Sequence, residues 1–260
     1  MHVFKPTAVA LKEKLELFPG SVVSPAVVKL TFALPDPASS LHSLGFDLGL
    51  GDFVRFRFPG TRARAYSPTS HPSEVGSFTI VIRVYPGGAV SPKLAALNLS
   101  DTAEVTGPLP VPWLTRKRYH GVKHIAAVAF GVGITELVSL LRSELLSDTT
   151  ETITVLWCLR KKDEQAIGSD LYDYSADKRV KFEYVFSRET DGKRADAELI
   201  STTFGHLNAK ETAVVCVGAK ASERECYLWF TSLGYKQRLL KMGIRFGGRT
   251  KSPLWTSIPK

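Results

Sequence analysis

The sequence is poor in the residues and patterns that mark several protein classes. Its 260 residues include only three cysteines and two methionines, and no run of 18 apolar residues occurs. An odd number of irregularly spaced cysteines predicts no disulfide framework, and the absence of a long apolar run argues against a membrane-spanning helix. The first residues lack the charged and apolar regions of a secretory signal, so we expect an intracellular protein, most simply a cytoplasmic one.

Acidic residues are missing from the last 25 positions, which hold seven Lys and Arg residues between Lys236 and Lys260. A second basic cluster runs from Arg116 to Lys123, and the formal net charge is +9. Such charge attracts acidic proteins, phosphates or anionic surfaces, and it equally fits a solvated basic surface. No nucleic-acid-binding motif accompanies it, so nucleic acid is not an expected partner. The histidines and cysteines show no metal-ligand spacing, so no metal site is predicted.

Short strands are predicted up to about residue 110. Residues 77–85 alternate most clearly, which sends two sets of side chains to opposite faces. The two sets are Phe78, Ile80, Ile82 and Val84, and Thr79, Val81, Arg83 and Tyr85. Further strands are predicted over residues 27–34, 52–58 and 103–109. Short strands separated by Pro and Gly turns indicate a small antiparallel barrel or sandwich.

The pattern changes after the proline-rich residues 107–112. Residues 124–130 form a continuous apolar run, followed by a Gly-Val-Gly turn and by leucines at helical spacing. More apolar strands are predicted over residues 152–159, 180–186 and 213–217, with room for helices between them. We therefore predict two domains: an antiparallel β-barrel over residues 1–112 and a parallel-sheet α/β domain of Rossmann-like type over residues 113–260.

Three motifs carry candidate chemistry. Gly131-Val-Gly133 joins a strand to a helix, where backbone amides can bind a phosphate, although such a turn is equally a structural device. In the first half, Arg64-Ala-Tyr66-Ser67-Pro68 offers a cation, an aromatic ring and a hydroxyl. Residues 87–91, Gly-Gly-Ala-Val-Ser, offer a glycine turn that opens a short helix. Together the last two motifs could hold a flavin and its pyrophosphate, although residues 64–68 taken alone fit better an extended edge strand that the proline ends.

In this order and spacing, the motifs resemble those of the ferredoxin reductase-like flavoproteins, most of all the NADH–cytochrome b5 reductase branch. That family reads Arg-x-Tyr-Ser/Thr-Pro, Val-Ile-Lys-Val-Tyr and Gly-Gly-x-x-Ser where this chain has residues 64–68, 81–85 and 87–91. The resemblance continues through the Gly-x-Gly-Ile-Thr turn at residues 131–135 and covers about residues 7 to 235. It implies an FAD-binding barrel followed by an NAD(P)-binding domain.

The resemblance also implies roles for single residues. Arg64 would pair with the FAD pyrophosphate, Tyr66 would pack on the isoalloxazine, and the hydroxyl of Ser67, the one expected catalytic residue, would bond near flavin N5. The other residues implied to hold FAD are Val81, Arg83, Tyr85, Gly87, Gly88, Val90 and Ser91. Those implied to border the nicotinamide nucleotide are Gly131, Gly133, Thr135 and Gly218.

A Ser-Arg pair ends the strand over residues 180–186. Relatives that prefer NADPH place such a pair where hydroxyl and guanidinium meet the adenosine 2′-phosphate, whereas NADH-preferring relatives often have an acid there. Ser187 and Arg188 occupy these positions, and the fork of guanidinium donors suits a phosphate. We therefore expect NADPH to be preferred over NADH.

The chain departs from the family pattern at three places. Glu136 follows Gly-x-Gly-Ile-Thr where the family has proline, and an acid there could repel a pyrophosphate. Val217 takes the place of the family's thiol, with Cys216 one residue early and on the other face of the strand. Relatives usually end at an aromatic close to the flavin, whereas this chain runs on to a basic tail containing Trp255.

Two functions follow from these observations. The first is a reductase that passes electrons from NAD(P)H through FAD to a one-electron acceptor, such as an acidic cytochrome b5-like haem protein. The second is a catalytically degenerate, reductase-like subunit that keeps FAD as a structural ligand and binds the other subunits of a complex. The departures affect the nicotinamide half more than the FAD half, and fold alone does not decide between these functions.

Overall fold

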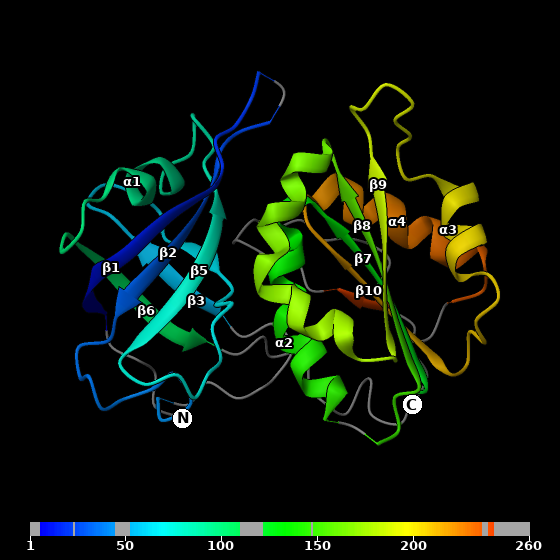
Figure 1. Cartoon of the computed structure of the whole chain (residues 1–260), viewed down its shortest axis with the longest axis horizontal. Helices are drawn as coiled ribbons and strands as arrows, with labels where there is room; N and C mark the ends of the chain where they lie inside the picture. Colours follow the sequence, from blue (N-terminus) through cyan, green and yellow to red (C-terminus); the bar gives the residue numbers. More distant parts are fainter. Residues whose placement is uncertain are drawn as a thin grey trace.

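The computed structural model describes residues 6–22, 24–44, 53–109, 122–146, 148–235 and 239–241. These residues form two sheets with different architectures, placed side by side (Figure 1). An antiparallel sheet from the first half of the chain lies beside a parallel sheet from the second half, as the sequence predicted. The expected boundary after residue 112 lies outside the described residues.

The first sheet is a six-stranded antiparallel barrel. Its strands are β1 (Thr7–Phe18), β2 (Val27–Ala33), β3 (Phe53–Arg57), β4 (Arg64–Tyr66), β5 (Ser77–Arg83) and β6 (Thr102–Leu109), in the order β4-β3-β6-β1-β2-β5. A bridge between Pro68 and Ile80 joins the two ends of this order. Beside it, the amide of Thr69 donates to the carbonyl of Thr79 at 2.8 Å. The short helix α1 (Ser91–Ala96) follows β5.

Strand β5 is buried on both faces because each face packs into a different core. Phe78, Ile80 and Ile82 belong to the barrel interior, which confirms the alternation predicted from the sequence. Val81, on the opposite face, packs into a core that also contains residues of the parallel sheet and its helix α2. One strand therefore forms part of the barrel wall and part of the interface between the two halves.

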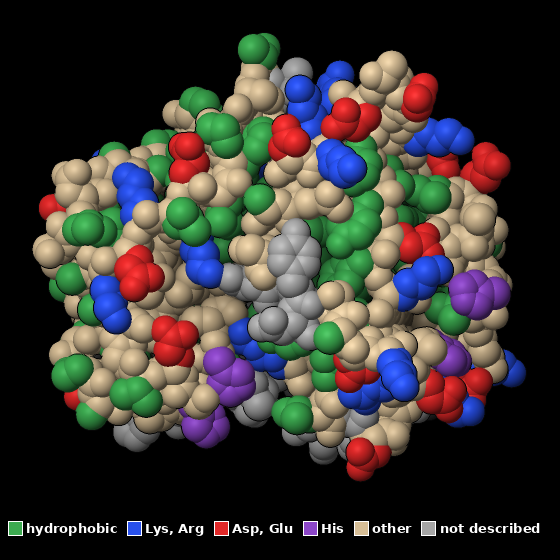
Figure 2. Space-filling view, viewed as in Figure 1, with side chains coloured by type: hydrophobic (Ala, Val, Ile, Leu, Met, Phe, Trp, Pro, Cys, Tyr) green, Lys and Arg blue, Asp and Glu red, His purple; other side chains and the backbone are tan. Residues whose placement is uncertain are grey.

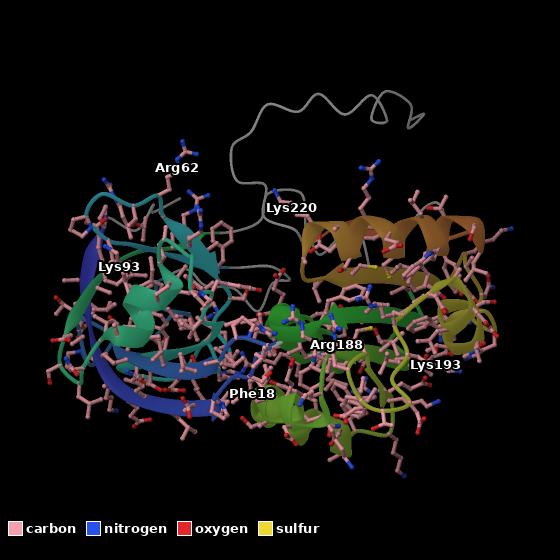
Figure 3. The ribbon with its side chains drawn as sticks, turned by 90° about the horizontal axis from the view of Figure 1, so that it is seen from above. Phe18, Arg62, Lys93, Arg188, Lys193 and Lys220 are labelled. Atoms are coloured by element: carbon pink, nitrogen blue, oxygen red, sulfur yellow. The ribbon has the colours of Figure 1, made fainter. Side chains whose placement is uncertain are left out.

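The second sheet is parallel and covered by helices on both faces. Its strands are β7 (His124–Phe130), β8 (Thr152–Leu159), β9 (Val180–Phe186), β10 (Thr212–Val217) and β11 (Leu239–Lys241), in the order β11-β10-β7-β8-β9. Helix α2 (Ile134–Leu145) and the 3-10 helix η3 (Lys162–Ala176) pack on one face. Helices α3 (Ala197–Phe204) and α4 (Lys220–Ser232) pack on the other, and Figure 3 shows α4 across the sheet from α2.

The apolar runs predicted as strands in the second half are confirmed almost to the residue, whereas β1 and β11 were not predicted from the sequence. Strand β1 is long, but five successive residues, Lys12 to Glu16, are exposed, and four of them are charged. These charged residues interrupt the apolar pattern that marks a strand. Strand β4, where an extended segment was expected, has only three residues, all half-buried.

Charged side chains of both signs are interspersed over the face shown in Figure 2. Lys123, the one described member of the basic cluster at residues 116–123, lies 3.0 Å from a carboxylate oxygen of Glu211 and 3.8 Å from one of Glu151. The rest of that cluster and most of the basic tail, including Trp255, lie outside the described residues. Within the described part, no helix is both long and apolar enough to cross a bilayer.

Candidate functional site

A cleft of about 690 Å³ opens between the barrel and the carboxyl ends of the parallel strands. Its walls come from β4, β5, the 87–91 turn, the turn after β7, and the ends of β8, β9 and β10. The structure brings every predicted site residue except Gly87 to this cleft. Those that line it are Arg64, Tyr66, Ser67, Val81, Arg83, Tyr85, Gly88, Val90, Ser91, Gly131, Gly133, Thr135, Ser187, Arg188 and Gly218.

The barrel wall presents the motif of residues 64–68. Arg64 and Tyr66 are half-buried on β4, and the hydroxyl-bearing Ser67 is buried just after it. The Tyr66 ring meets Phe56 of the barrel core edge-on, with 5.9 Å between ring centroids. Burial raises the pKa of the Tyr66 phenol to about 12, so this wall of the cleft presents a neutral aromatic surface at physiological pH.

The 87–91 turn forms the second barrel element of the site. The amide of Gly88 donates to the carbonyl of Tyr85 at 2.8 Å, and the amide of Tyr85 donates to Ser91 Oγ at 3.2 Å. A Cβ on Gly88 would lie 2.8 Å from Ser91 Oγ, so a glycine is needed for this tight turn. Gly87 has open space around it and does not line the cleft, so its predicted contact with cofactor has no geometric support.

Three glycines bring two turns of the parallel sheet together. Gly131 adopts φ +56° and Gly218 adopts φ +138°, conformations that favour glycine. A Cβ on Gly133 would lie 2.8 Å from both Gly218 Cα and the carbonyl oxygen of Val217. The turn that opens α2 therefore contacts the turn after β10 backbone to backbone at the part of the cleft floor where a dinucleotide could approach.

Glu136 lies in the first turn of α2 and lines this floor. Burial, and secondarily the neighbouring carboxyl of Glu223, raise the pKa of Glu136 to about 8. Glu223 is itself occupied, because its Oε1 accepts a hydrogen bond from the amide of Gly218 at 3.0 Å. At neutral pH Glu136 therefore holds its proton, and the repulsion of phosphate expected from the sequence is absent.

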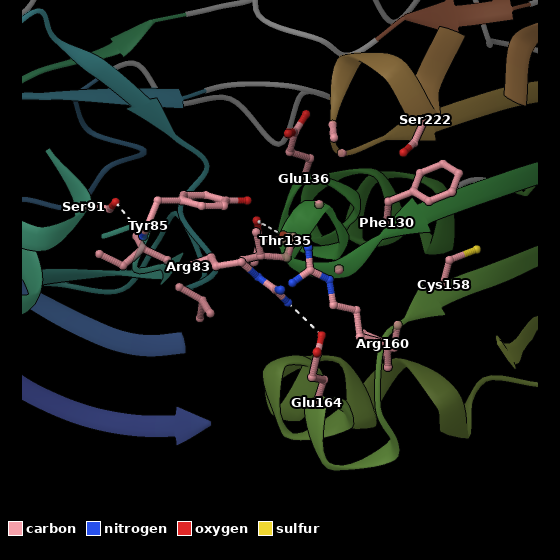
Figure 4. A pocket seen from close by; sticks show the side chains of 18 of the residues that line it. Arg83, Tyr85, Ser91, Phe130, Thr135, Glu136, Cys158, Arg160, Glu164 and Ser222 are labelled. Atoms are coloured by element: carbon pink, nitrogen blue, oxygen red, sulfur yellow. Dashed lines mark hydrogen bonds and ion pairs between the residues drawn. The ribbon is translucent and has the colours of Figure 1, made fainter. Parts of the chain in front are cut away.

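An ion pair crosses the cleft between the two domains. The Arg83 guanidinium of β5 donates to Glu164 Oε2 of η3 at 2.8 Å and to Ser24 Oγ at 2.8 Å. Both side chains are buried, at 6% and 0% exposure. Figure 4 shows this pair with Arg160, at the end of β8, pointing toward the same part of the cleft. The sequence did not reveal the pair, because 81 residues separate its members.

Three arginines line the half of the cleft that belongs to the parallel sheet: Arg160, Arg188 and Arg194. The amide of Arg188 donates to the carbonyl of Arg160 at 2.8 Å, which ties the ends of β8 and β9 together. Figure 3 shows Arg188 between the two halves, with Lys193 farther from the barrel. Only Arg188 was predicted; Arg160 and Arg194 share no motif with it, and only folding brings them to the cleft.

The cysteines lie where the strand register places them. Val217 packs into the core beneath α2, whereas Cys216 packs on the opposite face against α4, as the sequence predicted. Cys216 Sγ lies 3.3 Å from Cys226 Sγ, and neither lines the cleft. Cys158 of β8 does line it, but burial raises the pKa of its thiol to about 12, so it is no nucleophile at neutral pH.

Comparison with known proteins supports the assignment of the first half of the chain as an FAD-binding domain. A family model described as an oxidoreductase FAD-binding domain matches residues 14–111. NADH-cytochrome b5 reductase 2 of Aspergillus fumigatus is 32% identical over 149 residues, which are 54% of this chain and 43% of the relative. NADH-cytochrome b5 reductase 1 of Neosartorya fischeri is 31% identical over 134 residues, which are 51% of this chain and 40% of the relative. The match spans less than half the length of these relatives.

Solved structures with low sequence identity share the fold. The cytochrome b5 reductase domain of Ulva prolifera nitrate reductase has a TM-score of 0.66 at 21% identity, covering 91% of this chain and 96% of its own. A ferredoxin NADP+ reductase from Neisseria gonorrhoeae, solved with bound FAD and NADP, has a TM-score of 0.71 at 18% identity, with coverages of 88% and 92%. The barrel and the parallel sheet are thus shared as one arrangement.

Proposed function

Because this chain belongs to the ferredoxin reductase-like superfamily of flavoproteins, near the NADH-cytochrome b5 reductase branch, we propose that it is an NAD(P)H-dependent flavin oxidoreductase. One observation carries the proposal: a single cleft gathers the arginine, aromatic and hydroxyl side chains of the barrel and the glycine turns of the parallel sheet. Neither half alone contains both sets.

The residues present fit FAD on the barrel side. Arg64 supplies a cation for the pyrophosphate, the neutral Tyr66 ring supplies a flat surface for the isoalloxazine, and the buried Ser67 supplies a hydroxyl beside it. The turn of residues 88–91 lines the cleft wall and brings the Ser91 hydroxyl to it. When bound, FAD supplies the capacity to accept a hydride from a nicotinamide and to give electrons onward one at a time.

The opposite wall fits a nicotinamide dinucleotide. The glycines at positions 131, 133 and 218 bring backbone to the cleft floor where a dinucleotide could approach, and the protonated Glu136 removes a charge that would repel its phosphates. Because the cleft is shared with the barrel, both dinucleotides would lie in one site between the two domains. Tyr66, Ser67 and the glycine floor would then orient the two rings.

We propose NADPH as the preferred coenzyme. Arg188 follows Ser187 at the end of β9, and Arg160 and Arg194 line the same half of the cleft. Guanidinium groups bind phosphate oxygens by paired, charge-assisted hydrogen bonds. A 2′-phosphate would therefore meet several donors, whereas the 2′-hydroxyl of NADH would meet cations without an anion to neutralise them.

The electron acceptor we propose is an acidic one-electron carrier of the cytochrome b5-like kind. The excess of positive charge in the sequence would steer such a partner toward this protein. The competing function is a reductase-like subunit that retains FAD only as a structural ligand. It shares the FAD site with the enzyme but needs no coenzyme oxidation.

Anaerobic reduction of the purified, FAD-loaded protein tests these proposals. We expect NADPH to bleach the flavin absorbance and NADH to do so with a lower kcat/KM. If the flavin stays oxidised under an excess of both coenzymes, the reductase is ruled out and the structural subunit is retained. If NADH gives the higher kcat/KM, the coenzyme preference is wrong although the reductase stands.

A further inference from the structure

Glu164 is a buried carboxylate with one unused oxygen. Its Oε2 accepts the hydrogen bond from Arg83 at 2.8 Å, and the side chain is 0% exposed. Its Oε1 is also buried, and no hydrogen-bond donor reaches it from the described part of the chain. Glu164 nevertheless lines the cleft, facing Arg83 across it in Figure 4.

A purely structural ion pair does not account for this arrangement. A buried acceptor left without a partner costs about 1–3 kcal/mol, and more when it is charged. The other buried glutamates of the described residues, Glu144 and Glu223, leave no buried oxygen without a partner. At Glu164 the unused oxygen belongs to a side chain that lines the cleft.

The chemistry and position of Glu164 determine which ligand group can form a hydrogen bond with its unused oxygen. A carboxylate oxygen accepts hydrogen bonds, so it would take a hydroxyl or an N–H group and would repel a phosphate. Glu164 follows the carboxyl end of β8, and ligands of open α/β sheets bind outside those ends. Within the cleft, that is the half proposed for the nicotinamide dinucleotide, whose riboses carry hydroxyls and whose carboxamide carries N–H groups.

We propose that Glu164 Oε1 accepts a hydrogen bond from a ribose hydroxyl or the carboxamide N–H of the bound nicotinamide dinucleotide. Glu164 is then a recognition residue, and Arg83 is a positioning residue that holds its carboxylate from the barrel side. This inference rests on the proposed function, because it takes the nicotinamide dinucleotide as the ligand. The proposed hydrogen bond would recognise an uncharged donor group of the ligand, whereas the arginines of the cleft would bind its phosphates.

Glu164→Gln tests the contact with little change in size. Arg83 can only donate, so the glutamine carbonyl would turn toward it and the glutamine NH2 would replace Oε1. A carboxamide N–H would then face another donor, and a ribose hydroxyl would exchange its bond to a charged acceptor for a weaker bond from a neutral donor. We expect the Kd of NADP+ to rise by about 10- to 100-fold, the loss of a hydrogen bond to a charged group, with FAD content unchanged. Titration of the oxidised holoprotein with NADP+, followed by flavin absorbance, measures this without turnover.

Glu144→Gln is the matched control, because it makes the same change at a buried glutamate that does not line the cleft. We expect it to bind NADP+ as the wild type does. If Glu164→Gln does not fold, Glu164→Asp keeps the charge and shortens the side chain, and it should weaken NADP+ binding in the same direction.

The outcomes separate this inference from the proposed function. If the wild type binds NADP+ and Glu164→Gln binds it equally well, only the assignment of Glu164 is overturned. If the variant loses FAD instead and its NADP+ affinity is unchanged on reconstitution, the oxygen serves the flavin and the inference is again wrong. If the wild-type holoprotein binds neither NADP+ nor NAD+, the proposed function itself fails.

Discussion

Arg142 of α2 donates from Nη1 to the backbone carbonyl of Ser70 at 2.7 Å, which ties the α/β domain to the barrel loop that follows the 64–68 motif. The same guanidinium also donates to the carbonyl of Thr69, and its Nε donates to the Tyr174 hydroxyl of η3 at 2.6 Å. Arg83 reaches from barrel to α/β domain, and Arg142 reaches back. The two halves of the cleft are thus held by one arginine from each side.

Replacing Arg142 by Gln should loosen the loop that carries Ser67. Because the loop forms the flavin wall and not the nucleotide floor, we expect the rate of flavin reduction to fall about tenfold, as for a small misplacement of reacting groups, with less than a twofold change in the Kd of NADPH. Stopped-flow reduction over a range of NADPH concentrations under anaerobic conditions measures both quantities.

Arg179→Gln serves as the control for Arg142, because Arg179 bonds the Leu145 carbonyl and Asp177 within the α/β domain. It should leave the reduction rate at the wild-type value. Equal effects of the two variants would mean that Arg142 acts only through general stability.

Removal of the Arg64 side chain should empty the flavin site. Loss of a charge-assisted contact to a pyrophosphate is worth about 1.5–3 kcal/mol, or about 10- to 100-fold in FAD affinity. The absorbance ratio of flavin to protein after purification measures occupancy. Arg62→Ala, at an exposed arginine two residues earlier that does not line the cleft, should keep the wild-type ratio; full occupancy in Arg64→Ala would show that the motif does not bind FAD.

Arg188→Ala should reduce discrimination between the coenzymes. We expect the Kd of NADP+ to rise by about 10- to 100-fold, since a phosphate loses a guanidinium partner, while the Kd of NAD+ changes little. Lys193→Ala removes an exposed cation from the same loop but outside the cleft, and it should affect neither coenzyme. A parallel weakening of NAD+ and NADP+ in Arg188→Ala would contradict a 2′-phosphate site.

Nucleotide binding should depend on pH through Glu136. Its pKa is raised to about 8, so the carboxyl is neutral below that pH and becomes charged as the pH rises through it. We expect the Kd of NADP+ to increase about fivefold between pH 7 and 9, which corresponds to about 1 kcal/mol of repulsion between nearby like charges. Glu136→Gln cannot ionise, so its Kd of NADP+ should stay constant over this range. If the Kd of this variant rises with pH as it does in the wild type, the pH dependence comes from another group.

Gly133→Ala should destabilise the protein, because its Cβ would lie 2.8 Å from backbone atoms of Val217 and Gly218. The expected loss is about 1–3 kcal/mol in the free energy of unfolding, as for overpacking. Gly87→Ala meets no atom within 4 Å and should lie within about 0.5 kcal/mol of the wild type. Urea unfolding of the two variants compares them directly, and equal stabilities would show that the two turns can separate without cost.

Patterns local in sequence predicted most of this molecule. The alternation in β5 placed Val81 and Arg83 on the cleft face, and the glycine turn after β7 predicted the floor, because both depend on neighbours within a few residues. The Arg83–Glu164 and Arg142–Ser70 contacts could not be predicted this way, since they join distant segments through packing. Glu136 shows the same limit: its position was readable, but its protonation state depends on burial and on Glu223.

The two-sided burial of β5 also bears on how the protein unfolds. Phe18, Val27, Phe53 and Val81 of the barrel share one apolar core with the parallel sheet, so separating the halves would expose that core to water on both sides. We therefore expect the two domains to lose structure in one cooperative transition on heating, even though their architectures differ. An isolated barrel would expose these apolar side chains and would be less stable than the barrel within the whole protein. The residues of each domain at this interface are therefore constrained by the surface of the other domain.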